Sequence, residues 1–352
     1  MFQGPSNRRF LFYSTFADVK HLVIFLTVIL FFTSWQHRPF KEFHIAGPAQ
    51  GTVYRITYYA QDNLVTQAQV DSIFNSLDSS LSLYKPYSQV NAFNNSDTGV
   101  RTDIHLREVV RKAQEMYTAT VGAFDITVWP LVNAWGFGVQ KITDVPDAAA
   151  IAAIMPCVGA GKLKWSAEVL KKQLPCVQLD VNGIAQGYSV DVLARFLESK
   201  TIMNYMIELG GEIRVNGRKQ PGNTAMKIGI ESPGNHPFSP SLVKKVLSLN
   251  SGAVTTSGSY RRFYESNGRR ITHIIDPRTG ASIQNNLISV TVLAEDAITA
   301  DALDNALMVM GLEKGLRFAE ASGKIEAYFI YRTSRGSIAD TATAGFYSFI
   351  ER

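Results

Sequence analysis

Apolar residues recur along this chain with two spacings, one typical of amphipathic helices and one typical of strands. Helical spacing predicts helices at residues 65–83, 106–120, 147–155, 185–198 and 299–310. Alternating or continuous β-branched and aromatic runs predict strands at residues 52–59, 205–208, 226–231, 243–249, 287–293, 327–331 and 345–350. Because helices and strands do not alternate strictly, we expect an α+β fold, with a largely antiparallel sheet as its core and helices flanking it.

A hairpin is predicted around Asn267-Gly268, a pair that tolerates the positive φ angles of a two-residue turn. Its strands are expected at residues 259–266 and 269–275. Counting outward from the turn gives the pairs Ser266–Arg269, Arg262–His273 and Arg261–Ile274. Directly opposed residues share a face of the sheet, so Arg262 and His273 should point the same way.

The N-terminal segment has a pattern of its own. Residues 22–35 form an uncharged apolar run, preceded by Arg8, Arg9 and Lys20. This order is typical of a secretory signal, with residues 1–21 left in the cytoplasm, residues 36–46 as a linker and residues 47–352 as the exported domain. The run of 14 residues is shorter than the roughly 20 that span a bilayer, so a cleaved signal peptide and an uncleaved signal-anchor both stay open. A buried core helix is disfavoured, because the charges lie on one flank.

The net charge and the number of cysteines exclude several classes of function. The net charge is +5, but residues 1–41 hold five Lys or Arg against one Asp, which leaves 30 basic and 29 acidic residues in the rest. Residues 42–352 therefore have a net charge of +1 and lack the excess of positive charge that binding to a polyanion needs. On this ground we exclude nucleic-acid binding. Cys157 and Cys176 are too few for a zinc ribbon or an iron–sulfur cluster. Export would permit a disulfide between them, which their spacing alone does not decide.

Familiar nucleotide-binding patterns are absent. Gly159-Ala160-Gly161-Lys162 resembles the end of a phosphate loop, but Pro156 and Leu163 stand where that pattern needs Gly and Ser or Thr. Lys141 likewise replaces the third glycine of a dinucleotide fingerprint. If the protein binds a nucleotide, it does so through a motif other than these two.

Oxygen-bearing side chains share one face of the predicted helix at residues 299–310. At 100° per residue Asp301, Asp304 and Asn305 fall together, while the core residues fall on the opposite side. Carboxylate and amide oxygens suit Mg²⁺ or Ca²⁺. The alternative is a solvated acidic face near a helix N-terminus.

Three other positions are candidates for ligand chemistry. Asp180 leads through Gly183 into a helix, where backbone N–H groups suit phosphate, although a simple helix-capping turn has the same pattern. Asp125 lies among aromatic residues, as a flat heterocycle would require and as core packing would also produce. His273 beside Arg262 could take a hydroxyl proton, or could be a histidine bonded within the sheet.

Together these segments resemble the ApbE family of FAD:protein FMN transferases, from about Gly47 to the C-terminus. The matching stretches are AQGTVYRI, LSLYKPYSQVNAFN, GAFDITVWPLVNAWGFG, LDVNGIAQGYSVD, MIELGGEIRVNG, TTSGSYRRFYESNGRRITHIIDPRTG and SVTVLAEDAITADALDNALMVMG. The resemblance implies a Mg²⁺-dependent enzyme that splits FAD at its pyrophosphate, attaches FMN through a phosphoester to a Thr or Ser of an acceptor protein, and releases AMP. It implies acceptor subunits of sodium-translocating quinone reductases or related electron-transfer complexes, and a bacterial inner-membrane location with the catalytic domain in the periplasm.

The same resemblance assigns roles to individual residues. His273 would be the catalytic base, and metal contacts would fall on Gly183, Asp301 and Asn305, with Asp304 undecided. FAD contacts would fall on Gln50, Tyr84, Ala123, Phe124, Asp125, Asp180, Gln186 and Ile275.

The chain departs from the commoner family pattern at three of these positions. Gln50 replaces a usual Met, Gln186 a frequent Lys or Glu, and Asn305 a frequent Thr. Each keeps a hydrogen-bonding group, so the departures change contact details. Two other functions stay open: an FAD pyrophosphatase that gives FMN and AMP, and a non-catalytic FAD-binding assembly protein.

Overall fold

The structure is a computed structural model that describes Met1, Gly4 and residues 39–138, 144–232, 242–260, 262–266 and 268–351. The chain divides into two units, Met1–Phe40 and Lys41–Arg352, and the fold below is that of the second. The predicted apolar segment at residues 22–35 lies outside the described residues. Within the described part of the chain, no helix has both the length and the apolar character needed to cross a membrane.

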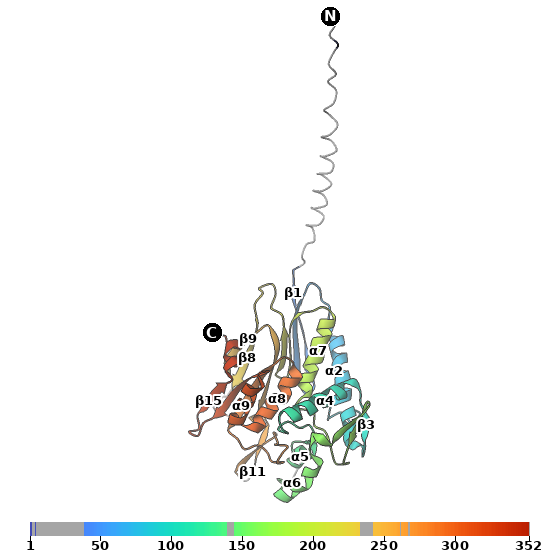
Figure 1. The fold of residues 1–352 in the computed structure, drawn as a ribbon, viewed down its shortest axis with the longest axis vertical. Helices are drawn as coiled ribbons and strands as arrows, with labels where there is room; N and C mark the ends of the chain where they lie inside the picture. The colour runs from blue at the N-terminus through green and yellow to red at the C-terminus, as the bar shows by residue number, and fades with distance from the viewer. Residues whose placement is uncertain are drawn as a thin grey trace. The chain divides into compact units, whose positions relative to one another are not determined.

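An eight-stranded sheet forms the core of the second unit, in the order β1-β2-β6-β7-β10-β13-β14-β15. Figure 1 labels the two edge strands of this sheet, β1 and β15. Every neighbouring pair of its strands is antiparallel, which confirms the predicted sheet. The strands are β1 (Lys41–Ala49), β2 (Thr52–Ala60), β6 (Asn204–Leu209), β7 (Glu212–Asn216), β10 (Ser251–Gly258), β13 (Leu287–Ala294), β14 (Glu326–Arg332) and β15 (Ile338–Ala342).

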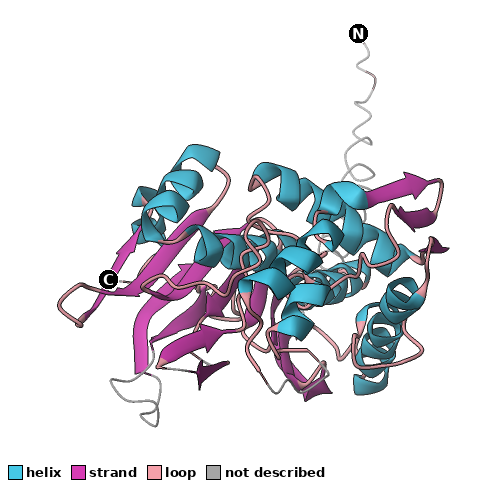
Figure 2. Cartoon of the chain, turned by 90° about the horizontal axis from the view of Figure 1, so that it is seen from below, coloured by secondary structure: helices cyan, strands magenta, loops and turns pink. Residues whose placement is uncertain are grey.

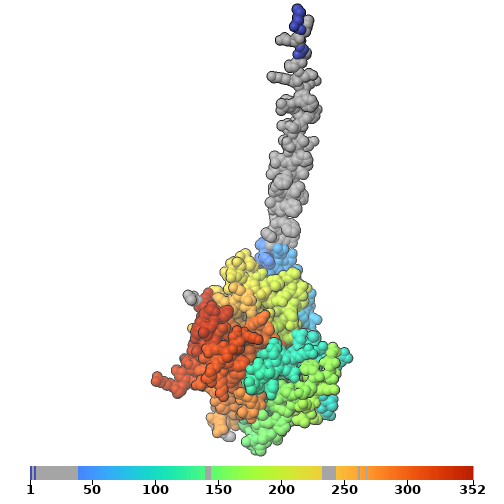
Figure 3. All heavy atoms as spheres, viewed as in Figure 1, coloured from blue at the N-terminus to red at the C-terminus, as the bar shows by residue number. Residues whose placement is uncertain are grey.

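Helices cover one face of this sheet (Figure 2). α7 (Ala185–Ser199) packs on β6 and β7, α8 (Ala297–Met310) on β10 and β13, and α9 (Leu312–Ser322) on β14. The other helices are α2 (Gln67–Leu81), α3 (Gln89–Asn95), α4 (Ile104–Ala119), α5 (Trp129–Ala134) and α6 (Ala148–Ile154). α8 also contacts α4, and Figure 3 shows these distant parts of the sequence, orange-red and teal, meeting at the surface.

The opposite face is covered by the hairpin of β8 (Met226–Ser232) and β9 (Leu242–Leu249) and by a 3-10 helix, η3 (Ala344–Phe349). The prediction of a strand at residues 345–350 is therefore wrong. Phe346 and Phe349 are three residues apart, which is the 3-10 period, so both turn toward the same small core. Phe346 stacks on Tyr328 with ring centroids 5.3 Å apart.

Sequence patterns missed several elements for different reasons, and α9 was missed although its apolar residues have a clear helical spacing. Residues 41–46 belong to β1, not to a linker, and this edge strand begins with exposed charged residues that obscured its alternation. β10 lies inside the sheet although its Gly and Ser content resembles a loop. Also missed were α3, α5, α9, β7, β15 and a small sheet of β3 (Gly99–Arg101), β4 (Leu163–Ser166) and β5 (Val169–Lys172).

The predicted hairpin forms, with β11 (Phe263–Ser266) and β12 (Arg269–Thr272) as its strands. Its register pairs Ser266 with Arg269, as counted from the sequence. One step beyond the ladder, the backbone N–H of His273 donates to the carbonyl of Arg262 at 3.3 Å, so these two residues are opposed as predicted. Arg261 lies outside the described residues.

Candidate functional site

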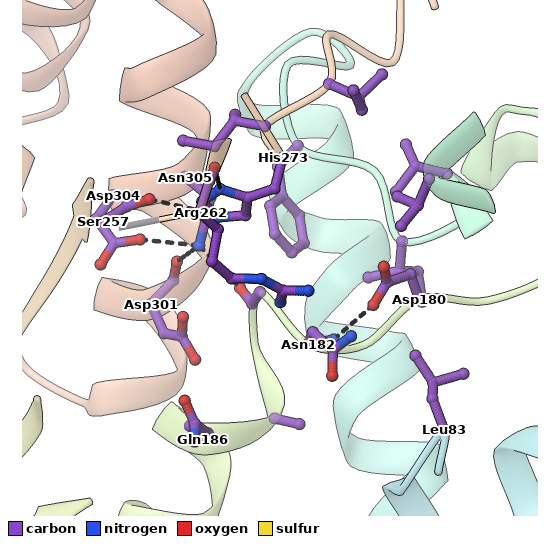
Figure 4. A pocket seen from close by; sticks show the side chains of 18 of the residues that line it. Leu83, Asp180, Asn182, Gln186, Ser257, Arg262, His273, Asp301, Asp304 and Asn305 are labelled. Carbon is purple, nitrogen blue, oxygen red and sulfur yellow. Dashed lines mark hydrogen bonds between the residues drawn. The ribbon is translucent and has the colours of Figure 1, made fainter. Parts of the chain in front are cut away.

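A cavity of about 580 Å³ opens between the loop after α2, the N-terminal end of α7, the β11–β12 hairpin and α8. Figure 4 shows its polar side chains pointing inward from these separate elements. Every site residue predicted from the sequence lines it: Gln50, Tyr84, Ala123, Phe124, Asp125, Asp180, Gly183, Gln186, His273, Ile275, Asp301 and Asn305. The fold therefore brings together residues that lie as far apart as 50 and 305 in the sequence.

The position of α8 is fixed by its first turn. Asp296 caps the helix by accepting from the N–H of Thr299, and Asp191 of α7 accepts from the N–H groups of Ala297 and Ile298 at 3.0 and 2.9 Å. Asp191 also forms an ion pair with Arg214 at 2.8 Å. These bonds satisfy the free N–H groups of the helix start and hold α8 against α7.

Asp301 and Asp304 are both buried, at 4% and 1% exposure, one turn apart on α8. Burial raises the pKa of Asp301 to about 7, against one hydrogen bond from the N–H of Gly187 at 2.9 Å. Burial and the neighbouring Asp301 raise the pKa of Asp304 well above its usual range. Two carboxyl groups this close in a buried site ionise together only if a positive charge joins them.

Asn305 marks the point where several oxygens of this site meet. Its Nδ2 donates to the carbonyl of Asp301 at 2.9 Å and to Oδ1 of Asp304 at 3.0 Å, and lies 3.5 Å from the carbonyl of Gly183. Its Oδ1 accepts from the hydroxyl of Ser257 at 3.1 Å. The amide thus turns its nitrogen toward the other oxygens, and Asn305 could ligate a cation through Oδ1 only after its amide flips. With the amide flipped, the carboxylate, carbonyl and amide oxygens suit Mg²⁺, which keeps water and phosphate as further ligands. Among the described residues no three His, Cys, Asp or Glu side chains form a metal cluster, so a cation here would depend on these other oxygens.

His273 has a defined tautomer. Its Nδ1 lies 3.0 Å from the carbonyl oxygen of Arg262, which can only accept, so Nδ1 carries the proton and Nε2 is left as an acceptor. Burial lowers the pKa of His273 below 6.5, which keeps the ring neutral at pH 7. The Phe137 ring forms a T-shaped pair with the imidazole of His273, with ring centroids 6.2 Å apart.

Arg262 extends its exposed side chain across the cavity. Figure 4 shows it reaching from the hairpin toward Asn182 and Asp180. Burial raises the pKa of Asp180 to about 6, and the N–H of Asn182 and the charge of Arg262 oppose that rise. The guanidinium thus places a positive charge between His273 and Asp180.

Asp125 is bonded within the protein. Its Oδ1 accepts from the N–H and the hydroxyl of Thr127, at 2.8 and 2.6 Å, and its Oδ2 accepts from the N–H of Ala160 at 3.0 Å. The carboxylate therefore shapes the loop that forms the cavity wall, while Ala123 and Phe124 beside it supply buried apolar surface.

Three further residues line the cavity with different exposure and hydrogen bonding: Gln50, Tyr84 and Gln186. The Tyr84 ring is 63% exposed and so is available to stack on a ligand. The Nε2 of Gln50 donates to the hydroxyl of Ser189 at 2.8 Å, while its Oε1 is buried with no partner. Gln186 lies beside Gly210, where an added Cβ would come within 3.4 Å of its amide.

Several lining residues were not predicted from the sequence, among them Asp78, Asn182, Glu212 and Ser257. Ser257 lies on β10, whose presence in the sheet was missed. Asp78 lies on the last turn of α2, and only the packing of that helix places it at the cavity. Asn182 lies two residues after Asp180, and the turn between Asp180 and Gly183 could have indicated it.

Comparison with known proteins gives one consistent result. Residues 50–329 match the model of the ApbE family. An FAD:protein FMN transferase of Vibrio cholerae is 36% identical over 322 residues, covering 90% of this chain and 95% of that protein. That of Escherichia coli K12 is 34% identical over 289 residues, covering 79% of this chain and 81% of its own.

Solved structures agree with the sequence matches. The flavin transferase ApbE from Vibrio cholerae superposes with a TM-score of 0.79 and 35% identity, covering 88% of this chain and 100% of that one. The apo form of the Pseudomonas stutzeri flavinyl transferase ApbE gives a TM-score of 0.80 at 35% identity, covering 88% of this chain and 97% of that one.

Proposed function

This chain belongs to the ApbE family and is a flavin transferase, and we propose that it moves FMN from FAD onto a Thr or Ser hydroxyl of an acceptor protein with Mg²⁺ as cofactor, releasing AMP. One observation carries the proposal. A single cavity joins an oxygen-rich acidic wall, a histidine with an unprotonated Nε2 and an apolar wall of Ala123, Phe124 and Ile275.

The acidic wall is where the metal would be held. Asp301, Asn305 and the carbonyl of Gly183 are its proposed ligands, with Asp304 directly beside them. Bound there, Mg²⁺ would supply the positive charge that a pyrophosphate needs before an anionic or hydroxyl oxygen can approach it. Asp191 and the capped start of α8 keep these ligands in place.

His273 is the proposed base. Its Nε2 accepts the proton of the acceptor hydroxyl while that oxygen forms a bond to the phosphorus of the FMN half, and the bond from that phosphorus to the bridging oxygen of AMP breaks. A positioned base of this kind contributes roughly 10²–10⁴-fold to the rate. Arg262, whose guanidinium reaches into the same space, would contact a phosphate oxygen.

The direct test is mass spectrometry of an acceptor protein incubated with the enzyme, FAD and Mg²⁺. We expect FMN on a threonine or serine and AMP in solution, and no modification by Asp301→Ala. Glu313→Ala, a change in the exposed first turn of α9, is the matched control and should retain activity. Modification of the acceptor by Asp301→Ala at the same rate would contradict the metal assignment.

The same assay separates the alternatives. Free FMN released equally with and without acceptor would indicate an FAD pyrophosphatase. Tight FAD binding without AMP under any condition would indicate a non-catalytic assembly protein.

The location and the acceptors are also proposals. We propose that residues 1–35 direct the catalytic domain across the bacterial inner membrane into the periplasm, where subunits of a sodium-translocating quinone reductase or a related electron-transfer complex are the acceptors. The apolar run with flanking positive charges supports export. The disulfide between Cys157 and Cys176 supports an oxidising compartment.

A further inference from the structure

The Cys157–Cys176 disulfide has no part in the chemistry proposed above, yet it lies next to the cavity wall. Cys157 ends a short 3-10 helix, η1 (Met155–Cys157), and Cys176 follows β5, with Cα atoms 5.4 Å apart. We name three segments here: the wall loop (residues 123–128), the cystine loop (residues 157–160) and the return segment (residues 176–180). The wall loop and the return segment carry Asp125 and Asp180 into the cavity.

The cystine loop is joined to the wall loop by two hydrogen bonds. The N–H of Gly159 donates to the hydroxyl oxygen of Thr127 at 2.6 Å, and the N–H of Ala160 donates to the carboxylate of Asp125 at 3.0 Å. Asp125 is buried, so this carboxylate depends on protein donors for its stability.

The wall loop is joined in turn to the return segment. The N–H of Asp180 donates to the carbonyl of Ile126 at 2.6 Å, and Val128 pairs with Gln178 in a parallel bridge. The disulfide then connects the return segment back to the cystine loop. The three segments therefore form a closed ring, and its only covalent cross-link among the described residues is this disulfide.

The return segment has further support that does not depend on the disulfide. The amide of Asn94 bonds to both the N–H and the carbonyl of Leu179, at 2.7 and 2.9 Å. The ammonium of Lys172 donates to the carbonyls of Pro175 and Val177. The cystine loop is also held by Lys162, whose ammonium donates to the carbonyl of Val158, and by the burial of Val158 and Ala160. Opening the disulfide would therefore remove the covalent tether of this loop and weaken one support of the wall loop, while the return segment stays in place.

We propose that this disulfide is a positioning element for FAD: closed, it holds the wall loop in the binding conformation, and opened, it lowers the affinity for FAD. This inference rests on the proposed function. A dithiol opens the bridge by giving two electrons and two protons, so that two cysteine thiols and one oxidised cyclic dithiol result. Apparent affinity then falls in proportion to the fraction of molecules that keep the binding conformation.

Reduction of the disulfide should change the rate of the transfer step less than it changes the binding of FAD. His273 follows the β11–β12 hairpin and Asp301 and Asn305 lie on α8, so none of them belongs to the ring. We expect reduction to raise both the Kd and the KM for FAD by about tenfold, as when about a tenth of the molecules stay competent, and to leave kcat within about twofold. A general loss of folding would lower kcat together with the fraction of active enzyme, so the two effects are separable.

The experiment compares the full-length chain oxidised, reduced by dithiothreitol and re-oxidised, with the thiol count followed by mass spectrometry. FAD binding is measured by quenching of flavin fluorescence, and transfer is measured on the acceptor. The double variant Cys157→Ser, Cys176→Ser should match the reduced protein and be insensitive to dithiothreitol. If that variant fails to fold, the reversible change in the unmodified chain still gives the comparison.

The outcomes are distinct. A Kd for FAD that is equal in the oxidised and reduced protein overturns the inference, and so does a fall in kcat at constant KM. If the oxidised protein binds no FAD at all, it is the proposed function that fails.

Discussion

Asp301 and Asp304 are two carboxyl groups buried in the protein interior. Both are buried, the charge of Asp301 raises the pKa of Asp304, and each carboxylate accepts a hydrogen bond from an N–H group, of Gly187 and of Asn305 respectively. Ionising the pair in the absence of a cation is therefore costly, and this cost is what a divalent ion would remove. We therefore expect the ionised pair to destabilise the protein without a cation and a bound cation to stabilise it.

We predict that Mg²⁺ raises the melting temperature of the protein and that Asp301→Asn abolishes the rise. Saturation at a hundredfold excess over Kd corresponds to about 2.7 kcal/mol of added stability. Differential scanning calorimetry with and without Mg²⁺ measures this, with Glu313→Gln on the exposed surface as control. An equal rise in Asp301→Asn would show that the ion binds elsewhere.

A second prediction concerns His273 and pH. Since burial lowers its pKa below 6.5, the imidazole is neutral at pH 7 and becomes protonated only in more acidic solution. At saturating Mg²⁺, which would keep Asp301 ionised despite its raised pKa, transfer should therefore stay constant from pH 8 to about 6.5 and fall below it. His273→Ala should lose roughly 10²–10⁴-fold in rate, and its residual rate should lack this acidic fall.

One result of the pH measurement would assign the loss of activity at acidic pH to a group other than His273. Asp180 has a pKa of about 6 and titrates in the same range. If the residual activity of His273→Ala still falls below pH 6.5, the fall belongs to Asp180 or to another group. Binding of FAD, measured separately at each pH, distinguishes a change in affinity from a change in the transfer step.

At the scale of elements, the site depends on how closely α7 and α8 approach. Gly187 lies where the two helices cross, and a Cβ there would come within 2.3 Å of the carbonyl of Ala297 and 2.7 Å of Cβ of Asp301. The N–H of Gly187 also donates to the carboxylate of Asp301. Glycine at this position thus lets one helix orient the proposed metal ligand carried by the other.

Gly187→Ala should consequently destabilise the protein by about 1–3 kcal/mol through overpacking. It should also weaken the stabilisation by Mg²⁺, because separating the helices moves Asp301. Gly161→Ala is the matched control, since nothing lies within 4 Å of the added Cβ. Urea denaturation with and without Mg²⁺ compares the two variants, and equal stability would argue against the close crossing.

For the whole molecule, the correct predictions rest on local patterns, namely the spacing of apolar residues in α8 and a two-residue turn. The apolar and polar faces of α8 predicted both the helix and its oxygen-bearing side, and the turn at Asn267-Gly268 predicted that His273 opposes Arg262. Pairing between strands that are distant in the sequence could not be predicted from the sequence. β10 has few apolar residues and is a strand because β7 and β13 pair with it on either side, so Ser257 was missed along with the strand.

The boundary of the fold gives the final prediction. The sheet begins at Lys41, where β1 pairs with β2 along its whole length, so a chain that starts at Phe40 retains every described strand. We expect such a truncation to keep the melting temperature and the oxidised-state affinity for FAD of the full chain when it is purified under oxidising conditions. In cells it should remain in the cytoplasm, where Cys157 and Cys176 stay reduced, and modify no periplasmic acceptor.

Fractionation of cells that produce the full chain completes this test. Recovery in the membrane fraction after alkaline carbonate extraction indicates a signal-anchor, and recovery in the periplasm as a shortened chain indicates a cleaved signal peptide. Equal amounts of full and truncated chain in the cytoplasm would contradict export. Thiol alkylation of each fraction then shows whether the disulfide forms only after the chain leaves the cytoplasm, as the redox difference between the two compartments requires.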